Sequence, residues 1–443
     1  MILGDLGFVL TALGGMLLLL LVPVMRLPAI LILLVCARSL TDIGGASGDP
    51  LLPNTLLNAA IAVSFVVLVL FSAGRALSRS STLLVVIGFL VTAFTVAVGL
   101  ANFGMAAESI HEGLRLLSVL AVFVIAVRVG SDYPKALVKL VPCTVLPATI
   151  VFLVGGVLES SFLVQATGRV AGTFSHANAA AAFMSVSALS CLGIWFFCRS
   201  KGLLLAGIAS LLALVLTQSL GGLAGFLAGT LALLIINTRL ALGVRLIALL
   251  GTTIIAYAIT AFSRLGDRLA AVGASSFSAR SSGEDSLGWR LLNWSMLLQE
   301  WKSSPWLGYG LGSTSTLLMP LSQPPHSLPV QLLVETGIFG MAITVVVLLF
   351  VVQRLAVSAA RGRWEASVLL GIVALMLVNG SESNLLGYTG TLYLIALISG
   401  LLVARIVEHS RATVESVMSN PKARTGAKRG GLDYVYSDGR FLP

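Results

Sequence analysis

Two arginines and a histidine, Arg169, Arg290 and His326, are the residues of this chain whose types are best suited to chemistry. Guanidinium groups bind the oxygens of a diphosphate bidentately, which lysine does not. An imidazole with an ordinary pKa of about 6.5 can accept a proton from an attacking hydroxyl near neutral pH. If the three side chains converge, they predict a site in which Arg169 and Arg290 hold a diphosphate and His326 activates a hydroxyl.

His326 follows Pro324 and Pro325 and directly precedes an apolar segment that begins near Val330. Because paired prolines restrict the backbone, they should stiffen His326 at the entrance to a membrane span. The neighbouring Ser327 has a hydroxyl that could orient the imidazole ring. A helix cap or an interface residue is the alternative interpretation of a lone histidine at such a place.

Arg290 lies in a segment with apolar residues at three- and four-residue spacing, which predicts an amphipathic helix on the membrane surface. These residues are Leu287, Leu291, Trp294, Leu298 and Trp301. A capping-box pattern at Ser281 and Glu284 precedes the helix, and Pro305 ends it. Four of the six tryptophans fall here and suit the bilayer interface or stacking on sugars: Trp289, Trp294, Trp301 and Trp306. Arg290 would face the ligand from the polar side of this helix, beside Asn293, although an ion pair with Glu284 or Asp285 is the alternative.

Gly308, Gly310 and Gly312 follow the helix, and a glycine-rich loop can present its amide hydrogens to a phosphate. No strand precedes them, so they do not form a dinucleotide-binding motif. Glu335 lies nine residues beyond His326, where we expect a supporting contact or a packing role rather than an ion site.

The segment from residue 168 to 178 carries Arg169 together with His176 and Asn178. These last two residues could orient the loop or cap the following helix. Capping is favoured because asparagine is a preferred N-cap residue.

The elements that must position these residues are transmembrane helices. The chain has 443 residues, 57% hydrophobic and 10% charged, with a mean hydropathy of +1.00. Apolar runs of about 17 to 25 residues recur without strand-like alternation, which predicts an all-α, polytopic bundle of about 12–13 spans. Their centres lie near residues 15, 33, 65, 91, 119, 147, 188, 209, 229, 250, 340, 372 and 396. Residues 1–404 would form this helical domain, with 263–328 as a large loop inside it.

The positive charges predict the orientation of the spans, since short cytoplasmic loops are rich in Lys and Arg. Five basic loops alternate consistently, and they place Arg169, Arg290 and His326 on the outer, periplasmic face of a bacterial inner membrane. Residues 405–443 would be a flexible basic tail in the cytoplasm, able to contact anionic membrane lipids. Topology therefore explains the net charge of +10 without nucleic acid.

Several classes of chemistry lack their motifs in this sequence. We find no metal-binding, Walker, Gly-x-Ser-x-Gly or nucleic-acid pattern in the outward loops, and expect neither a metal nor a cofactor. The four cysteines, Cys36, Cys143, Cys191 and Cys198, fall in apolar helices without a C-x-x-C pair, which is typical of packing residues.

In order and spacing, these elements resemble the O-antigen ligase and polysaccharide polymerase superfamily of bacterial envelope proteins. The elements are an arginine before Gly-Thr-Phe-Ser-His-Ala-Asn, then Ser219 to Gly222, Arg290 with Trp294, Pro305 to Gly312, and His326 followed by Leu333 to Gly340. The resemblance covers roughly residues 160–400. It departs at Ser327, where the superfamily often has asparagine.

The resemblance implies a glycosyltransferase that moves a saccharide from undecaprenyl diphosphate to a glycan or a lipid A core, without a metal. Arg169 and Arg290 would hold the diphosphate, and His326 would activate the acceptor hydroxyl. The alternative is a transporter or flippase of a polar solute or a lipid-linked glycan. Transport normally places charged groups near the bilayer midplane, whereas these residues gather at one face.

Overall fold

The computed structural model of the protein describes residues 26–41, 53–72, 79–103, 107–158, 169–237, 286–318, 320–321 and 324–419, with 241, 243, 245–246 and 250–251. These residues form helices and their connections, and none of them belongs to a β-strand. The predicted all-α fold is therefore confirmed. The predicted span near residue 15 and most of the one near residue 250 lie outside the described residues.

Every other predicted span corresponds to a helix. These helices are α2 (Leu27–Leu40), α3 (Pro53–Ser72), α4 (Arg79–Phe103), α5 (Ala107–Asp132), α6 (Ala136–Val157), α7 (Ala177–Cys198), α8 (Lys201–Leu216), α9 (Leu220–Ile236), α13 (Leu328–Ala360), α14 (Trp364–Glu382) and α15 (Thr389–Ser419). Among the described residues, seven helices are long and apolar enough to cross a membrane: α4, α5, α6, α7, α13, α14 and α15. The other four have shorter apolar stretches of 10–17 residues.

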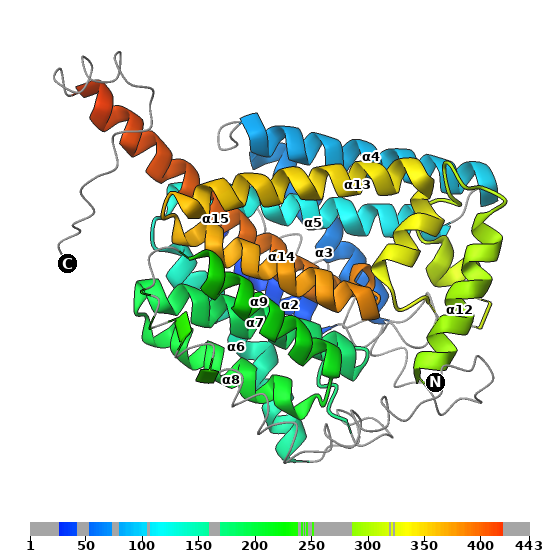
Figure 1. The fold of residues 1–443 in the computed structure, drawn as a ribbon, viewed down its shortest axis with the longest axis horizontal. Coiled ribbons are helices and arrows are strands. Elements are labelled where there is room, and N and C mark those ends of the chain that lie inside the picture. The colour runs from blue at the N-terminus through cyan, green and yellow to red at the C-terminus, as the bar shows by residue number, and fades with distance from the viewer. Residues whose placement is uncertain are drawn as a thin grey trace.

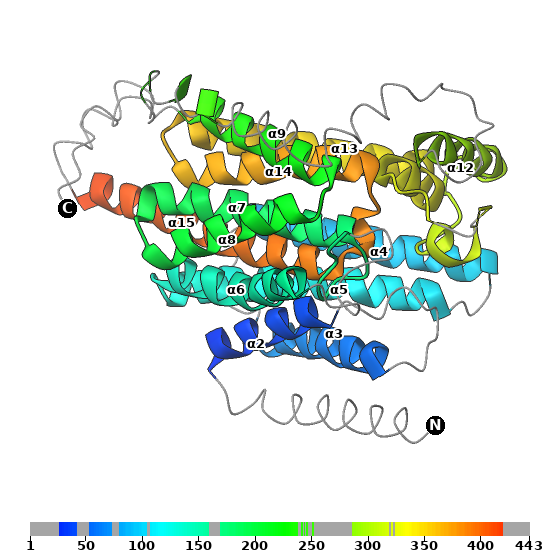
Figure 2. The ribbon, with the colours of Figure 1, turned by 90° about the horizontal axis from the view of Figure 1, so that it is seen from below.

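The helices lie side by side in a bundle, and α12 (Ser286–Trp301) crosses one end of it (Figure 1). The second view places α2 and α3 on one side, α9, α13 and α14 on the opposite side, and α7 and α15 between them (Figure 2). The predicted amphipathic helix therefore exists, and it marks what we call the α12 end of the bundle.

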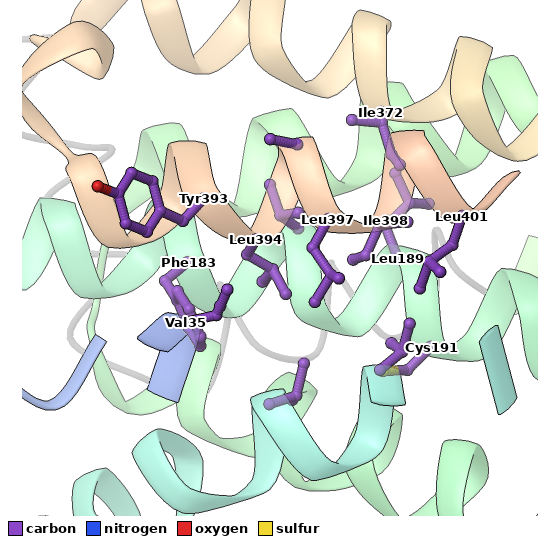
Figure 3. Close-up of a cluster of buried hydrophobic side chains, with 14 of the residues drawn as sticks. Val35, Phe183, Leu189, Cys191, Ile372, Tyr393, Leu394, Leu397, Ile398 and Leu401 are labelled. Atoms are coloured by element: carbon purple, nitrogen blue, oxygen red, sulfur yellow. The ribbon is translucent and has the colours of Figure 1, made fainter. Parts of the chain in front are cut away.

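The core lies around α15, which meets side chains from several helices (Figure 3). Its contribution consists of Tyr393, Leu394, Leu397, Ile398 and Leu401, all at most 1% exposed. Val35 of α2, Phe183, Leu189 and Cys191 of α7 and Ile372 of α14 face them from the neighbouring helices. The hydroxyl groups of Tyr393 and Ser118 are 2.6 Å apart and hydrogen bond to each other inside this core.

Small residues let the helix backbones approach closely. A Cβ atom added to Gly229 of α9 would lie 2.7 Å from the carbonyl oxygen of Gly371 in α14. The residues from Ala179 to Ala182 in α7 are at most 1% exposed. Close contact through small residues is the usual way in which helices associate within a bilayer, because apolar burial gives little advantage there.

α4 and α13 present apolar side chains to the outside. Leu90 is 58% exposed in α4, and Val346 and Leu349 are 65% and 62% exposed in α13. Such faces are expected where helices meet lipid rather than water.

The opposite end of the bundle holds a buried acid. The Glu365 side chain is 1% exposed. Its Oε1 atom lies 3.6 Å from Arg405 Nε and 3.3 Å from His409 Nδ1, within ion-pair distance of both. The guanidinium of Arg405 also lies over the Trp364 ring, 5.6 Å from its centroid.

α15 continues as a helix to Ser419, beyond residue 404, where the predicted helical domain ends. The rest of the predicted tail, residues 420–443, lies outside the described residues.

Candidate functional site

Aromatic rings from four separate segments meet at the α12 end. The ring centroid of His326 is 6.3 Å from that of His176 and 5.9 Å from that of Trp289. The ring centroid of His176 is also 5.2 Å from that of Tyr388. The loops that precede α7, α13 and α15 therefore meet one another and the first turns of α12.

His326 has a backbone conformation that is unusual for its type, with φ of 49°. This left-handed region costs a non-glycine residue on the order of 1–2 kcal/mol, so neighbouring contacts must hold it. Two residues of α12 supply them: Asn293 Nδ2 donates to the carbonyl oxygen of Pro324 at 3.3 Å, and Trp294 Nε1 donates to that of Pro325 at 2.6 Å. Trp294 therefore fixes the loop that carries His326.

The imidazole of His326 is largely enclosed. No described residue, Ser327 included, hydrogen bonds to its buried Nδ1 atom. Burial first, then the positive charge of Arg290, then His176, lower the pKa of His326 to about 4. The ring is therefore neutral near pH 7 and able to accept a proton.

The positive charge of Arg290 acts on both His326 and Glu382, the last residue of α14. Within the described ranges Arg290 makes no hydrogen bond or ion pair, and the alternative partners Glu284 and Asp285 lie outside them. Asn293, three residues further on, is completely buried. The side of α12 that we expected to be polar therefore faces the bundle and the site.

Arg169 belongs to the other side of the histidine pair. Its Nε donates to the carbonyl oxygen of Thr217 at 3.0 Å, and its Nη2 donates to Asn178 Oδ1 at 2.8 Å. The same oxygen of Asn178 accepts from the Ser219 hydroxyl at 3.3 Å. Arg169 thus joins its own loop to the turn between α8 and α9, while its charge acts on His176. The two arginines flank the two imidazoles.

His176 and Asn178 divide the two expected roles, one capping α7 and the other orienting the loop. His176 occupies the N-cap position, and its Nδ1 accepts a hydrogen bond from the Ala179 amide at 3.2 Å. Asn178 lies inside the first turn of α7, where its Oδ1 atom accepts hydrogen bonds from Arg169 and Ser219 instead. The preference of asparagine for N-caps therefore does not decide the role of Asn178, because its tertiary contacts do.

The glycine loop does not offer its amides to a phosphate. The amides have protein acceptors: Gly308 donates to Ser304, Tyr309 to Val334, Gly310 to Glu335 and Leu311 to Thr95. Gly310 has φ of 97°, and a Cβ added there would lie 2.1 Å from the Cα atom of Gly99 in α4. Gly312 is likewise left-handed, with φ of 81°. The loop connects α4 to α13, so these amides are not available for the phosphate contact that a glycine-rich loop can make.

Glu335 of α13 hydrogen bonds to the end of the glycine loop. Its Oε1 accepts from the Thr314 hydroxyl at 2.6 Å and from Gln331 Nε2 at 3.3 Å, and the carboxyl group is completely buried. The next turn of α13 is interrupted at Gly337, with φ of 64°. Glu335 is thus a packing residue that connects the helix after His326 to the loop before it. In the described part of the chain, no group of three His, Cys, Asp or Glu could hold a metal ion.

Three residues at the site were not predicted: Trp289, Glu382 and Tyr388. From the sequence, Trp289 had only the general roles of the other tryptophans, at the bilayer interface or in stacking on sugars, and no predicted contact with His326. Glu382 lies so near α9 that a Cβ added to Gly221 would be 2.5 Å from its carboxyl carbon. Glu382 and Tyr388 lie at the end of α14 and just before α15, so an acid and an aromatic residue at the end of a span were the available signal.

The fold and the site define a class: a multi-pass helical membrane protein with arginines and imidazoles gathered at one end of its bundle. Residues 205–345 match the O-antigen ligase family. This match confirms the resemblance to the O-antigen ligase and polysaccharide polymerase superfamily over the part that carries Arg290 and His326, and indicates an enzyme of the ligase or glycosyltransferase type. A comparison with curated protein sequences gave no match.

Proposed function

We propose that this protein transfers a saccharide from undecaprenyl diphosphate to the hydroxyl of a saccharide acceptor, on the periplasmic face of the bacterial inner membrane. The acceptor is a growing glycan or a lipid A core, and we favour polymerisation slightly. The observation that carries the proposal is the enclosed His326–His176 pair, with ring centroids 6.3 Å apart and an arginine beside each ring.

The acceptor oxygen forms a bond to the anomeric carbon, and the bond between that carbon and the diphosphate oxygen breaks. His326 takes the acceptor proton, and undecaprenyl diphosphate leaves with the electron pair. A diphosphate is a good leaving group, so cations that stabilise its charge and a placed base suffice without a metal. Arg290 and the remaining donors of Arg169 would bind the diphosphate oxygens.

Donor binding would also tune the base. Arg290 disfavours a proton on His326 in the free protein. The negative charges of a bound diphosphate would offset that effect and make the imidazole more basic when the acceptor is in place. The base would therefore gain strength only in the presence of the donor.

The test uses the purified protein in nanodiscs with lipid-linked repeat units. We expect His326→Asn to lower the transfer rate by about 10²–10⁴-fold, the usual contribution of a general base. Asparagine suits this test because it tolerates the left-handed backbone of residue 326. Arg290→Ala and Arg169→Ala should each lower kcat/KM by at least about tenfold, since a hydrogen bond to a charged group contributes roughly 1.5–3 kcal/mol.

Arg361→Ala is the matched control, because Arg361 is an exposed arginine between α13 and α14 at the opposite end of the bundle. It should retain the wild-type rate. Wild-type transfer by His326→Asn would contradict the assigned base. Movement of intact substrate across the membrane without any new glycosidic bond would favour the transporter alternative.

A further inference from the structure

The two histidines of the site differ in what holds their rings. His176 Nδ1 accepts the Ala179 amide hydrogen at 3.2 Å, so this nitrogen carries no proton of its own. In a neutral ring the proton must then be on Nε2. The helix cap therefore fixes one tautomer and makes Nε2–H of His176 a hydrogen-bond donor.

This N–H group has no acceptor among the residues that the structure describes. The His176 ring contacts those of Tyr388 and His326, at centroid distances of 5.2 Å and 6.3 Å. Burial first, and then Arg169, lower the pKa of His176 to about 4. The ring is consequently neutral at pH 7, and a neutral imidazole held in one tautomer is a donor only at its free nitrogen.

On the basis of the proposed function, we infer that His176 donates a hydrogen bond from Nε2 to an oxygen of the diphosphate leaving group. His176 would keep its proton throughout, while His326 takes the proton of the acceptor. The hydrogen bond strengthens as negative charge develops on the diphosphate oxygen, so it acts mainly in the transition state. His176 would thus act as a hydrogen-bond donor to the leaving group, and His326 as the proton acceptor for the attacking hydroxyl.

The substitution that tests this role is His176→Asn. Asparagine retains the cap on Ala179, because it is itself a preferred N-cap residue, but it has no donor at the position of Nε2. We expect kcat and kcat/KM to fall together by about 10–100-fold, as for an interaction made in the transition state. Thermal stability should stay near that of the wild type, and His176→Ala should lose about 1 kcal/mol of stability in addition.

A measurement independent of activity uses nitrogen-15 NMR of labelled histidine side chains, which is tractable because the chain has four histidines. We expect the His176 signals to show the Nε2–H tautomer, and the Nε2 proton to move downfield when undecaprenyl diphosphate is added. His326→Asn should retain this shift. Undecaprenol, which has no phosphate, should not cause it.

An Nδ1–H tautomer, or no response to saturating undecaprenyl diphosphate, would overturn the inference. Full activity of His176→Asn would do the same. If the downfield shift occurs but wild-type protein transfers no saccharide, the donor role at the diphosphate stands and the proposed reaction fails.

Discussion

The chemistry of single residues depends on what encloses the two imidazoles. Both His326 and His176 have their pKa lowered to about 4, with burial as the largest cause and a neighbouring arginine as the next. A base with such a low pKa is weak in the free protein but always unprotonated at neutral pH. His326 is therefore a weaker base than an ordinary histidine, but nearly all of it is unprotonated at neutral pH before the donor binds.

This environment predicts the acid limb of the pH profile. Because kcat/KM reports groups of the free enzyme, we expect it to stay nearly constant from pH 8 to about 5.5 and to fall towards pH 4. An ordinary histidine would already be about 90% protonated at pH 5.5. An acid limb near pH 6.5 would contradict the buried state of His326.

The same shifts link stability to pH. Since the folded pKa is below the unfolded one, the unfolded chain binds more protons between about pH 6.5 and 4. The free energy of unfolding should therefore be largest above pH 6.5 and decrease as the pH falls through that window. Thermal unfolding of purified protein at pH 7.5 and 5 would measure it.

At the scale of elements, α12 acts as a clamp on the loop before α13. Its Asn293 and Trp294 hold the carbonyl groups of Pro324 and Pro325, directly ahead of the left-handed His326. Hydrophobic periodicity predicted α12, but it assigned Trp294 to the apolar face. A helix that lies across the end of a bundle can thus use an interface residue to position a functional one.

Trp294→Phe tests the role of α12 in holding this loop, because it removes the indole N–H bond to Pro325, and the control below accounts for the lost ring volume. We expect a loss of about 1 kcal/mol, measured as a roughly fivefold lower kcat/KM for glycan transfer. Trp301→Phe is the matched control, since the buried Nε1 of Trp301 has no acceptor among the described residues. Equal effects of the two substitutions would argue against the clamp.

The interruption of α13 at Gly337 permits the close approach of the glycine loop. Its φ of 64° and ψ of −170° suit only glycine, and a Cβ there would lie 2.3 Å from the carbonyl oxygen of Trp306. We expect Gly337→Ala to destabilise the protein by at least about 1–3 kcal/mol in thermal unfolding. Gly251→Ala, whose Cβ would meet nothing within 4 Å, should not destabilise it, and similar unfolding temperatures for the two variants would contradict the strain argument.

At the scale of the whole molecule, the segments that directly precede α7, α13 and α15 meet at the α12 end. The basic turn between α13 and α14, with Arg361 and Arg363, and the Glu365–Arg405 contact lie at the other end. The positive-inside rule then predicts which end faces the periplasm. The site and the basic loops are consequently expected on opposite sides of the bilayer.

Cysteine labelling in intact cells tests this orientation. Ser303→Cys lies in the exposed turn after α12, and Arg361→Cys in the exposed turn between α13 and α14. A membrane-impermeant maleimide should label the first variant in intact spheroplasts and the second only after lysis. The unsubstituted protein controls for the native cysteines, and the reverse pattern would invert the proposed topology.

The spans could be predicted because bilayer thickness alone determines the length of their apolar runs. Arg290 and His326 could be proposed because they interrupt apolar sequence. The amide partners of Gly310 and Leu311 could not, since they come from α13 and α4, and pairing between distant segments leaves no local pattern. Which of His176 and Asn178 caps α7 could not be predicted for a similar reason, because distant contacts with Arg169 and Ser219 engage Asn178.

The apolar outer faces of α4 and α13 have a kinetic consequence. If lipid surrounds these helices up to the α12 end, a lipid-anchored donor reaches the imidazoles by lateral diffusion in two dimensions. The relevant concentration is then the mole fraction of donor in the membrane, not its amount per volume of solution. Diluting a fixed quantity of donor with inert phospholipid should therefore slow the enzyme as effectively as removing donor.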